Sequence, residues 1–346
     1  MLIKINKKIK IEIGKKPLLI AEISANHQGD KKNFLRHIVE AHKAGADMIK
    51  IQTYEAEDIT VKKYSNKVKI KKGIWKNKSP WEIYSKAQTP YSWHKDAFKL
   101  AKKINAVLFS TPFSLKGVNF LEKFKVPIYK IASLEITDLN LIKCIASKKK
   151  PIILSTGLAS YQDIKTAINL IKKYHNKIII LHCVSGYPTP IEEINLSRIE
   201  LIKEKFKTKF VGLSDHTTSD EASLGSIFYG SCLIEKHFTL NKKSLDGKFS
   251  LLPNEFKKLS NKIDIFHKMI GEKKFSLKKS EKVNLNQRRS IFSIKDIDIG
   301  EKLTSLNISS FRPFIGINSN LFFKVLGSKA KKKIKAFTSV KKNYLF

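Results

Sequence analysis

The segment FVGLSDHT, residues 210–217, begins as an apolar β-strand and ends in side chains that can hydrogen-bond, accept a proton or hold a metal. The next apolar run, CLIEKHFT at residues 232–239, has the same construction and carries His237 near its end. Because side chains alternate along a strand, Ser214 and His216 share one face, and Glu235 and His237 share one face. The pair therefore indicates a site built where two consecutive strands finish.

Six further apolar runs of strand length precede this pair. The segments between runs, such as residues 31–47 and 161–177, carry apolar residues at three-and-four spacing, as helices that cover a sheet do. Repeated strand–helix alternation predicts an α/β protein with a parallel sheet, and eight units predict a closed (β/α)8 TIM barrel. An open doubly wound sheet fits less well, because no G-x-G-x-x-G follows the first run. The eight runs are LLIAEIS (18–24), MIKIQTY (48–54), AVLFSTPF (106–113), IYKIAS (128–133), PIILSTG (151–157), IIILHCVS (178–185), FVGLSDH (210–216) and CLIEKHFT (232–239).

Each run ends in a polar or reactive residue. In barrels of this kind the active site lies at the carboxyl ends of the strands, so these residues should converge on one mouth. They are Glu22, Gln52, Thr111, Ser133, Thr156, Ser185, His216 and His237.

The flanking segments complete the predicted organisation. Residues 2–17 alternate apolar and charged positions, which predicts an N-terminal β-hairpin at the barrel bottom. Residues 55–90 are too long for an ordinary connection and should help to wall the site. We therefore predict a catalytic barrel over residues 1–270, a linker over 271–286 and a small C-terminal domain over 287–346.

The charge of the chain raises the alternative of a nucleic-acid-binding protein. Lys and Arg number 67 against 30 Asp and Glu, for a formal net charge of +37. The lysines are spread along the chain, which favours solvated faces that attract small anions.

Cys144, Cys183 and Cys232 form no C-x-x-C pair, so we expect free thiols in a reducing cytoplasm. No apolar run approaches the roughly 18 residues that a membrane helix requires.

Two histidines are candidate metal ligands. His216 and His237 end consecutive strands, which are neighbours in a barrel, so both imidazoles could approach one ion. Two imidazoles completed by carboxylates or water suit a divalent cation such as Mn²⁺, with Mg²⁺ or Co²⁺ as alternatives. Spacing alone leaves open whether they are hydrogen-bonded structural residues instead.

Two lysines lie inside apolar strands, Lys50 in MIKIQT and Lys130 in YKIAS. An unpaired buried ammonium is costly, so each predicts an anionic partner. Either the lysines form a pocket for phosphate or carboxylate, or they snorkel or pair with internal carboxylates. The hydroxyls of such a pocket would be Thr111, Ser133 and Ser214, and the internal carboxylates, also candidate acid–base groups, would be Glu22 and Glu235.

An ordered set of motifs resembles the sialic acid synthase family over nearly the whole chain. The resemblance implies a phosphoenolpyruvate-condensing barrel, a divalent metal and a small antifreeze-like (SAF) domain at the C-terminus. ISANH, TPYSWH and GLSDHT most resemble the branch that makes pseudaminic acid from 2,4-diacetamido-2,4,6-trideoxy-L-altrose, with the neuraminate and legionaminate branches as close alternatives. The motifs are AEISANHQGD (21–30), IKIQTY (49–54), FSTPF (109–113), YKIAS (129–133), STG (155–157), YPTP (187–190), GLSDHT (212–217), IEKHFTL (234–240) and RRSIF with IGE (288–292 and 299–301).

By this resemblance His216 and His237 would bind the metal and act with Glu22 in catalysis. The implied phosphoenolpyruvate ligands are Lys50, Thr111, Lys130, Ser133, Ser185 and Ser214, and the implied sugar contacts are Gln52, Tyr187, Asp246 and Arg312.

The resemblance also implies a domain-swapped homodimer, in which Arg312 reaches a partner's active site. Two departures from the family pattern matter: the first favours an acceptor other than N-acetylmannosamine, and the second bears on Arg312. Neuraminate synthases carry Asn where this chain has Ser185, and the family tract RPG appears here with Phe314 in place of glycine. A bulky ring at position 314 changes how closely the Arg312 loop can approach.

Overall fold

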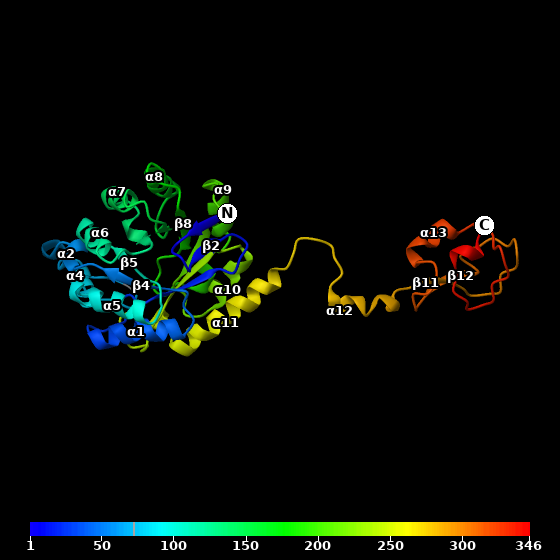
Figure 1. The fold of residues 1–346 in the computed structure, drawn as a ribbon, viewed down its shortest axis with the longest axis horizontal. Helices are drawn as coiled ribbons and strands as arrows, with labels where there is room; N and C mark the ends of the chain where they lie inside the picture. Colours follow the sequence, from blue (N-terminus) through cyan, green and yellow to red (C-terminus); the bar gives the residue numbers. More distant parts are fainter. Residues whose placement is uncertain (72) are drawn as a thin grey trace. The chain divides into compact units, whose positions relative to one another are not determined.

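The computed structural model describes residues 1–71 and 73–346, and the chain divides into two compact units, Met1–Gly271 and Glu272–Phe346. In the first unit, parallel strands close into a barrel in the order β10-β3-β4-β5-β6-β7-β8-β9. Helices surround these strands (Figure 1). The predicted (β/α)8 barrel is confirmed. The barrel strands are β3 (Leu18–Glu22), β4 (Met48–Thr53), β5 (Leu108–Pro112), β6 (Tyr129–Ile131), β7 (Ile152–Ser155), β8 (Ile178–Cys183), β9 (Val211–Asp215) and β10 (Leu233–His237).

The helices of this unit bury apolar faces against the outside of the barrel. Helix α1 shows the pattern, with Phe34, Ile38 and Ala41 buried on one side. Asp30 accepts a hydrogen bond from the backbone N–H of Lys32 and so caps the first turn. The helices are α1 (Lys31–Lys43), α2 (Ala56–Ile59), α3 (Lys62–Ser65), α4 (Pro80–Ala87), α5 (Tyr91–Lys103), α6 (Leu115–Glu122), α7 (Leu139–Ser147), α8 (Tyr161–Lys172), α9 (Arg198–Lys205), α10 (Glu221–Phe228) and α11 (Pro253–Ile270).

Alternation along the strands stacks a polar layer on an apolar one inside the barrel. The apolar layer is a buried cluster that includes Ile20, Met48, Phe109, Ile153 and Leu233. Because side chains repeat every second residue on one face, the residue two positions later also points inward. That step leads to Glu22, Lys50, Thr111, Ser155 and Glu235, all buried.

The N-terminal hairpin closes the opposite end of the barrel. Strands β1 (Leu2–Lys4) and β2 (Lys10–Glu12) pair antiparallel. Ile3 and Ile11 belong to the same buried cluster as the apolar layer, so the predicted position of the hairpin is correct. Position 212 in β9 requires glycine, because a Cβ there would lie 2.1 Å from the carbonyl oxygen of Leu233 on the neighbouring strand β10.

The long segment 55–90 contains helices α2, α3 and α4 instead of a structureless loop. Helix α4 starts with a capping box, in which Ser79 and Glu82 satisfy each other's backbone N–H groups, and Pro80 occupies the first turn. Lys72 lies outside the described residues.

The second unit has its own small core and little regular structure. Strands β11 (Ser290–Ser293) and β12 (Ile308–Phe311) pair antiparallel, and the helices are α12 (Lys279–Lys282) and α13 (Phe322–Val325). Ile291, Ile308 and Ile334 belong to its buried cluster. The predicted linker over 271–286 includes α12, and the assignment of this unit as an SAF domain stays a prediction.

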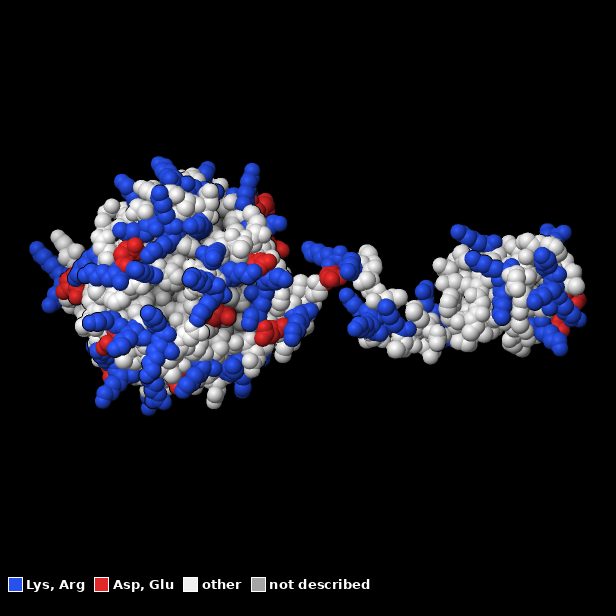
Figure 2. Space-filling model, viewed as in Figure 1, with Lys and Arg blue, Asp and Glu red and all other residues white. Residues whose placement is uncertain are grey.

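Lysine and arginine side chains are scattered over the face seen in Figure 2 and are not gathered into one stripe. On this face the distribution favours general solvation over a dedicated nucleic-acid surface. Among the helices of the described residues, none is both long and apolar enough to cross a membrane.

Candidate active site

A cavity of about 250 Å³ lies at the carboxyl ends of the barrel strands, lined by residues of the polar layer and of the loops above it. It brings together most of the predicted site residues. Those that line it are Glu22, Lys50, Gln52, Lys130, Ser133, Tyr187, Ser214, His216, His237 and Asp246.

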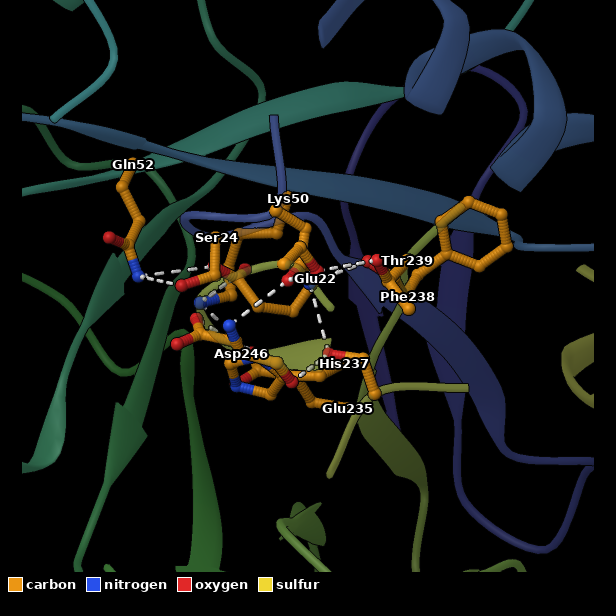
Figure 3. A network of polar contacts seen from close by, with 12 residues as sticks. Glu22, Ser24, Lys50, Gln52, Glu235, His237, Phe238, Thr239 and Asp246 are labelled. Carbon is orange, nitrogen blue, oxygen red and sulfur yellow. Dashed lines mark hydrogen bonds and ion pairs between the residues drawn. The ribbon is translucent and has the colours of Figure 1, made fainter. Parts of the chain in front are cut away.

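A chain of buried ion pairs forms the floor of this cavity. The Lys50 Nζ lies 2.7 Å from the Glu22 Oε2 and 3.5 Å from the Glu235 Oε2. The Lys130 Nζ lies 3.1 Å from the Glu235 Oε1, which also accepts a hydrogen bond from the Ser214 hydroxyl at 3.0 Å. Figure 3 shows Glu22, Lys50 and Glu235 pointing toward one another. Both lysines are therefore paired with internal carboxylates, one of the two arrangements that the sequence left open.

The ion pairs set the charge state of the floor. Burial alone would lower the pKa of Lys50, but Glu22 and Glu235 outweigh burial and hold that pKa above its usual range. Burial lowers the pKa of Lys130, although Glu235 opposes the shift. Burial also raises the pKa of Glu22. Lys50 opposes this shift, so Glu22 is a buried carboxyl group whose pKa depends on the ammonium beside it.

Polar side chains beside Glu22 form a second group. The Gln52 amide nitrogen donates to the Glu22 Oε1 at 3.2 Å and to the Ser24 hydroxyl at 3.0 Å. Asp246, which precedes the short 3-10 helix Gly247–Phe249, is buried, and burial raises the pKa of its carboxyl. These groups lie together in Figure 3 and can hydrogen-bond a hydroxylated ligand.

The two histidines lie side by side, with ring centroids 5.2 Å apart. The His216 Nδ1 is 2.9 Å from the carbonyl oxygen of Val184, which leaves the Nε2 free to act as a ligand. Burial lowers the pKa of His237, so its imidazole is neutral.

His237 supplies the observation that tests the fit of a metal. Its Nδ1 is buried without a hydrogen-bond partner among the described residues, and lies 3.8 Å from the Asp246 Oδ2. That separation exceeds a hydrogen bond, whereas ligand bonds of about 2.1 Å from each atom could span it. The described residues contain no cluster of three His, Cys, Asp or Glu side chains arranged around an ion. A divalent cation thus fits here if water or substrate oxygens complete its shell.

Three predicted site residues are not among the described residues that line the cavity. Thr111 is buried and contacts the site by accepting a hydrogen bond from Lys50 at 3.2 Å. Ser185 follows β8 with its hydroxyl 3.9 Å from the Cys183 thiol, and it is not among the cavity-lining residues that the structure describes. Arg312 is exposed in the second unit, so its expected role stays a prediction.

Ser155 and Glu135 are among the cavity residues that sequence reasoning missed. Ser155 is buried, and its hydroxyl has no hydrogen-bond partner in the described parts of the chain. Thr156 was expected at the mouth instead, but its hydroxyl donates to the carbonyl oxygen of Leu181, away from the lining. Because Ile153 points into the barrel and side chains on a strand alternate between faces, Ser155 also points inward, so alternation counted from Ile153 would have identified it. Glu135 also lines the cavity, and burial raises its pKa to about 7.

On the outer side of the same strands, Asp215 pairs with Lys236 at 2.9 Å, and both side chains are fully buried. Asp215 accepts hydrogen bonds from the Thr217 N–H and hydroxyl and from the Ser223 hydroxyl. Lys236 donates to the Thr217 carbonyl oxygen at 2.7 Å. The residues on both sides of His216 are therefore held in place, which gives Asp215 a structural role.

Comparisons with known proteins agree with this geometry. A family model described as the NeuB family matches residues 37–275. A pseudaminic acid synthase of Campylobacter jejuni is 40% identical over 326 residues, covering 93% of this chain and 94% of that protein. An N,N'-diacetyllegionaminic acid synthase of the same organism is 38% identical over 328 residues, covering 93% of this chain and 98% of that protein.

A solved structure is similar in both fold and sequence. It is the N-acetylneuraminic acid (sialic acid) synthetase of Leptospira borgpetersenii in complex with citrate. The TM-score is 0.73 at 32% identity, and the match covers 83% of this chain and 96% of that one.

Proposed function

The chain belongs to the NeuB family, and from this premise we propose that it condenses phosphoenolpyruvate with 2,4-diacetamido-2,4,6-trideoxy-L-altrose and water, giving pseudaminic acid and phosphate. The observation that carries the proposal is the chain of ion pairs Glu22–Lys50–Glu235–Lys130 beside two histidines at a barrel mouth. It combines cations for an anionic substrate, carboxyl groups for proton transfer and imidazoles for a metal.

Phosphoenolpyruvate would bind over Lys50 and Lys130, where its phosphate and carboxylate can exchange with the internal carboxylates. Ser133, Ser155 and Ser214 offer hydroxyl donors at the cavity wall. Thr111 would hold the Lys50 ammonium, and Ser185 belongs to the proposed set by family resemblance.

His216 and His237 would hold the divalent cation, and we propose Mn²⁺. Bound there, the cation supplies Lewis-acid polarisation of the sugar aldehyde oxygen. The neutral state of His237 and its unpartnered Nδ1 in the described structure support this assignment.

The side chains around the cavity would then guide a carbon–carbon condensation. Gln52, Tyr187 and Asp246 would orient the open-chain sugar so that its aldehyde carbon faces the methylene carbon of phosphoenolpyruvate. As that carbon attacks, the aldehyde oxygen takes up a proton and becomes a hydroxyl, while positive charge develops at C2, next to the carboxylate and phosphate held by the lysines. Glu22 would take a proton from the water that adds at C2, and the resulting tetrahedral carbon releases phosphate.

A second candidate is an enzyme that uses the legionaminate-type acceptor, favoured by the 38% identity to the diacetyllegionaminic acid synthase. N-acetylmannosamine fits less well, because Ser185 stands where neuraminate synthases carry Asn.

We also propose that the active form is a homodimer in which Arg312 of the partner subunit completes the sugar site. Mixing inactive Arg312→Ala and Glu22→Gln subunits tests this arrangement, because exchanged dimers would contain one site with both native residues. Activity should return on mixing, and no recovery in demonstrably exchanged dimers would refute it.

The function itself is tested by phosphate release from phosphoenolpyruvate with Mn²⁺ and three sugars in parallel: the altro-configured 2,4-diacetamido-2,4,6-trideoxyhexose, its legionaminate-type isomer and N-acetylmannosamine. Release with the altrose sugar is expected. Release with another sugar only would change the acceptor, and no release with any would contradict the proposed reaction.

A further inference from the structure

The cavity has two chemically different halves. Its floor carries the ion pairs and histidines, whereas its outer side carries the side chains that we call the apolar wall: Ile59, Ile70, Trp75, Ile83, Phe113 and Leu245. Most of these come from the segment between β4 and α5 or from the loop after β10. A ligand that reaches from the floor to the mouth therefore meets ionic groups at one end and hydrocarbon at the other.

The apolar wall is packed before any ligand arrives. Tyr54 and Ala87 are buried in one cluster with Ile59, Phe113 and Leu245. The ring centroids of Tyr54 and Phe113 are 4.9 Å apart in an edge-on arrangement. Preformed apolar surface of this kind binds methyl groups without first having to order itself.

The turn that carries Trp75 is also held in place. The Ile70 N–H donates to the Lys78 carbonyl oxygen at 3.0 Å, and the Asn77 N–H donates back to the Ile70 carbonyl oxygen at 2.9 Å. The Trp75 ring lies 5.5 Å from the Tyr187 ring, which in turn contacts His216. Trp75 therefore covers the side of the cavity above the histidines.

Trp75 adds one unsatisfied polar group to this surface. Its Nε1 is inaccessible to solvent and has no hydrogen-bond partner among the residues that the structure describes. Indole nitrogen can only donate, so this N–H needs an acceptor that the described residues do not supply. The carbonyl oxygen of an acetamido group, flanked by its own methyl, supplies an acceptor within an apolar surrounding.

We propose that the apolar wall selects a 6-deoxy acceptor sugar with an acetamido group at C4 over one with hydroxyls at C4 and C6, with Trp75 donating to the C4 acetamido carbonyl. This inference rests on the proposed function and assigns the specificity to named residues. A diacetamido-trideoxyhexose presents a C6 methyl and two acetamido methyls, whereas N-acetylmannosamine presents hydroxyls at C4 and C6. Those hydroxyls would lose water against the wall without gaining a partner. The wall sorts sugars by class, since the altro-configured sugar and its legionaminate-type isomer carry the same methyl groups.

The test measures kcat/KM for the preferred diacetamido-trideoxyhexose and for N-acetylmannosamine in the wild type, Ile59→Ser, Ile70→Ser and Trp75→Phe. Apolar pockets discriminate by about 10 to 200-fold per group, so we expect a wild-type preference of ~10² or more. Each serine variant should lower that preference about tenfold through KM for the sugar. Trp75→Phe should weaken the diacetamido sugar alone by about tenfold, and KM for phosphoenolpyruvate should stay within about twofold throughout.

Two controls separate specificity from damage to the fold. Ile265→Ser makes the same chemical change on the exposed outer side of α11, where the native side chain is 57% exposed, and should leave the preference unchanged. Ile70→Leu keeps the wall apolar and should therefore retain the wild-type sugar preference. An unchanged preference in all three wall variants would overturn the inference while leaving the condensation reaction intact, as would a wild type that prefers N-acetylmannosamine. A wild type that releases no phosphate with any sugar would instead refute the proposed function.

Discussion

Replacing Lys236 with methionine would leave the Asp215 carboxylate buried without its cation. Removing one partner of a buried ion pair typically costs about 3–5 kcal/mol of folding free energy. Here the carboxylate still accepts three hydrogen bonds, two from Thr217 and one from Ser223, which favour its charged form. The loss should therefore fall near the lower limit, at about 3 kcal/mol. For a unit of this size that loss corresponds to a fall in Tm of roughly 6 to 12 °C.

Urea unfolding followed by tryptophan fluorescence measures this loss in the barrel alone. All three tryptophans, Trp75, Trp81 and Trp93, lie within Met1–Gly271, so unfolding of the second unit contributes no direct signal. The double variant Asp215→Asn/Lys236→Met is the matched control. Asparagine keeps an oxygen that accepts from Thr217 but carries no charge, so the double variant should recover most of the stability, within about 1 kcal/mol of the wild type. A single variant that costs less than ~1 kcal/mol, or a double variant no more stable than the single, would refute the assignment of the cost to an orphaned charge.

Four further outcomes are expected. Glu22→Gln and His237→Ala should each lower kcat for phosphate release by about 10² or more while the barrel still shows a cooperative urea transition; near-normal turnover would remove that residue from the reaction. Ser155→Ala should raise KM for phosphoenolpyruvate about tenfold, the loss of one hydrogen bond to a charged ligand, and an unchanged KM would show that the hydroxyl does not touch it. Chelation of divalent metals should abolish phosphate release and added Mn²⁺ should restore it, whereas full activity in the chelator would exclude the metal assignment. Burial raises the pKa of Glu135 from 4.5 to about 7, so its neutral form stabilises the fold and that contribution is lost as the pH rises through 7. Glu135→Gln should therefore exceed the wild type in stability at pH 8, by up to ~3 kcal/mol, and match it at pH ~4, below the unfolded pKa; equal stabilities at pH 8 would contradict the raised pKa.

The barrel was predictable from sequence because its determinants are local. Each strand reads as a short apolar run, and each helix shows the spacing of one buried face. Neighbouring strands also place Glu22 next to Lys50 in register, so that contact follows from chain order once the barrel is assumed. The same alternation located most of the cavity side chains.

The errors and omissions have physical causes too. Assigning the inward position to Thr156 in place of Ser155 is a shift of one residue, which on a strand exchanges the two faces. The ion pair between Lys130 and Glu235 crosses the barrel interior, since β6 and β10 are not neighbours. The sequence named pairing with Glu22 or Glu235 as one alternative, but it could not decide for it, because the contact depends on the closed barrel bringing distant strands together.

The pairing of Lys50 and Lys130 with Glu22 and Glu235 has a consequence for which anions can occupy the floor. Both lysines of the floor are already paired, so an anion that binds there must displace a carboxylate from its lysine. A ligand with a single weak charge gains too little from that exchange to displace a carboxylate already in place. A ligand that brings phosphate and carboxylate together can engage both lysines at once. The internal carboxylates thereby act as a threshold that keeps common monovalent anions out, even though the chain as a whole carries a net charge of +37.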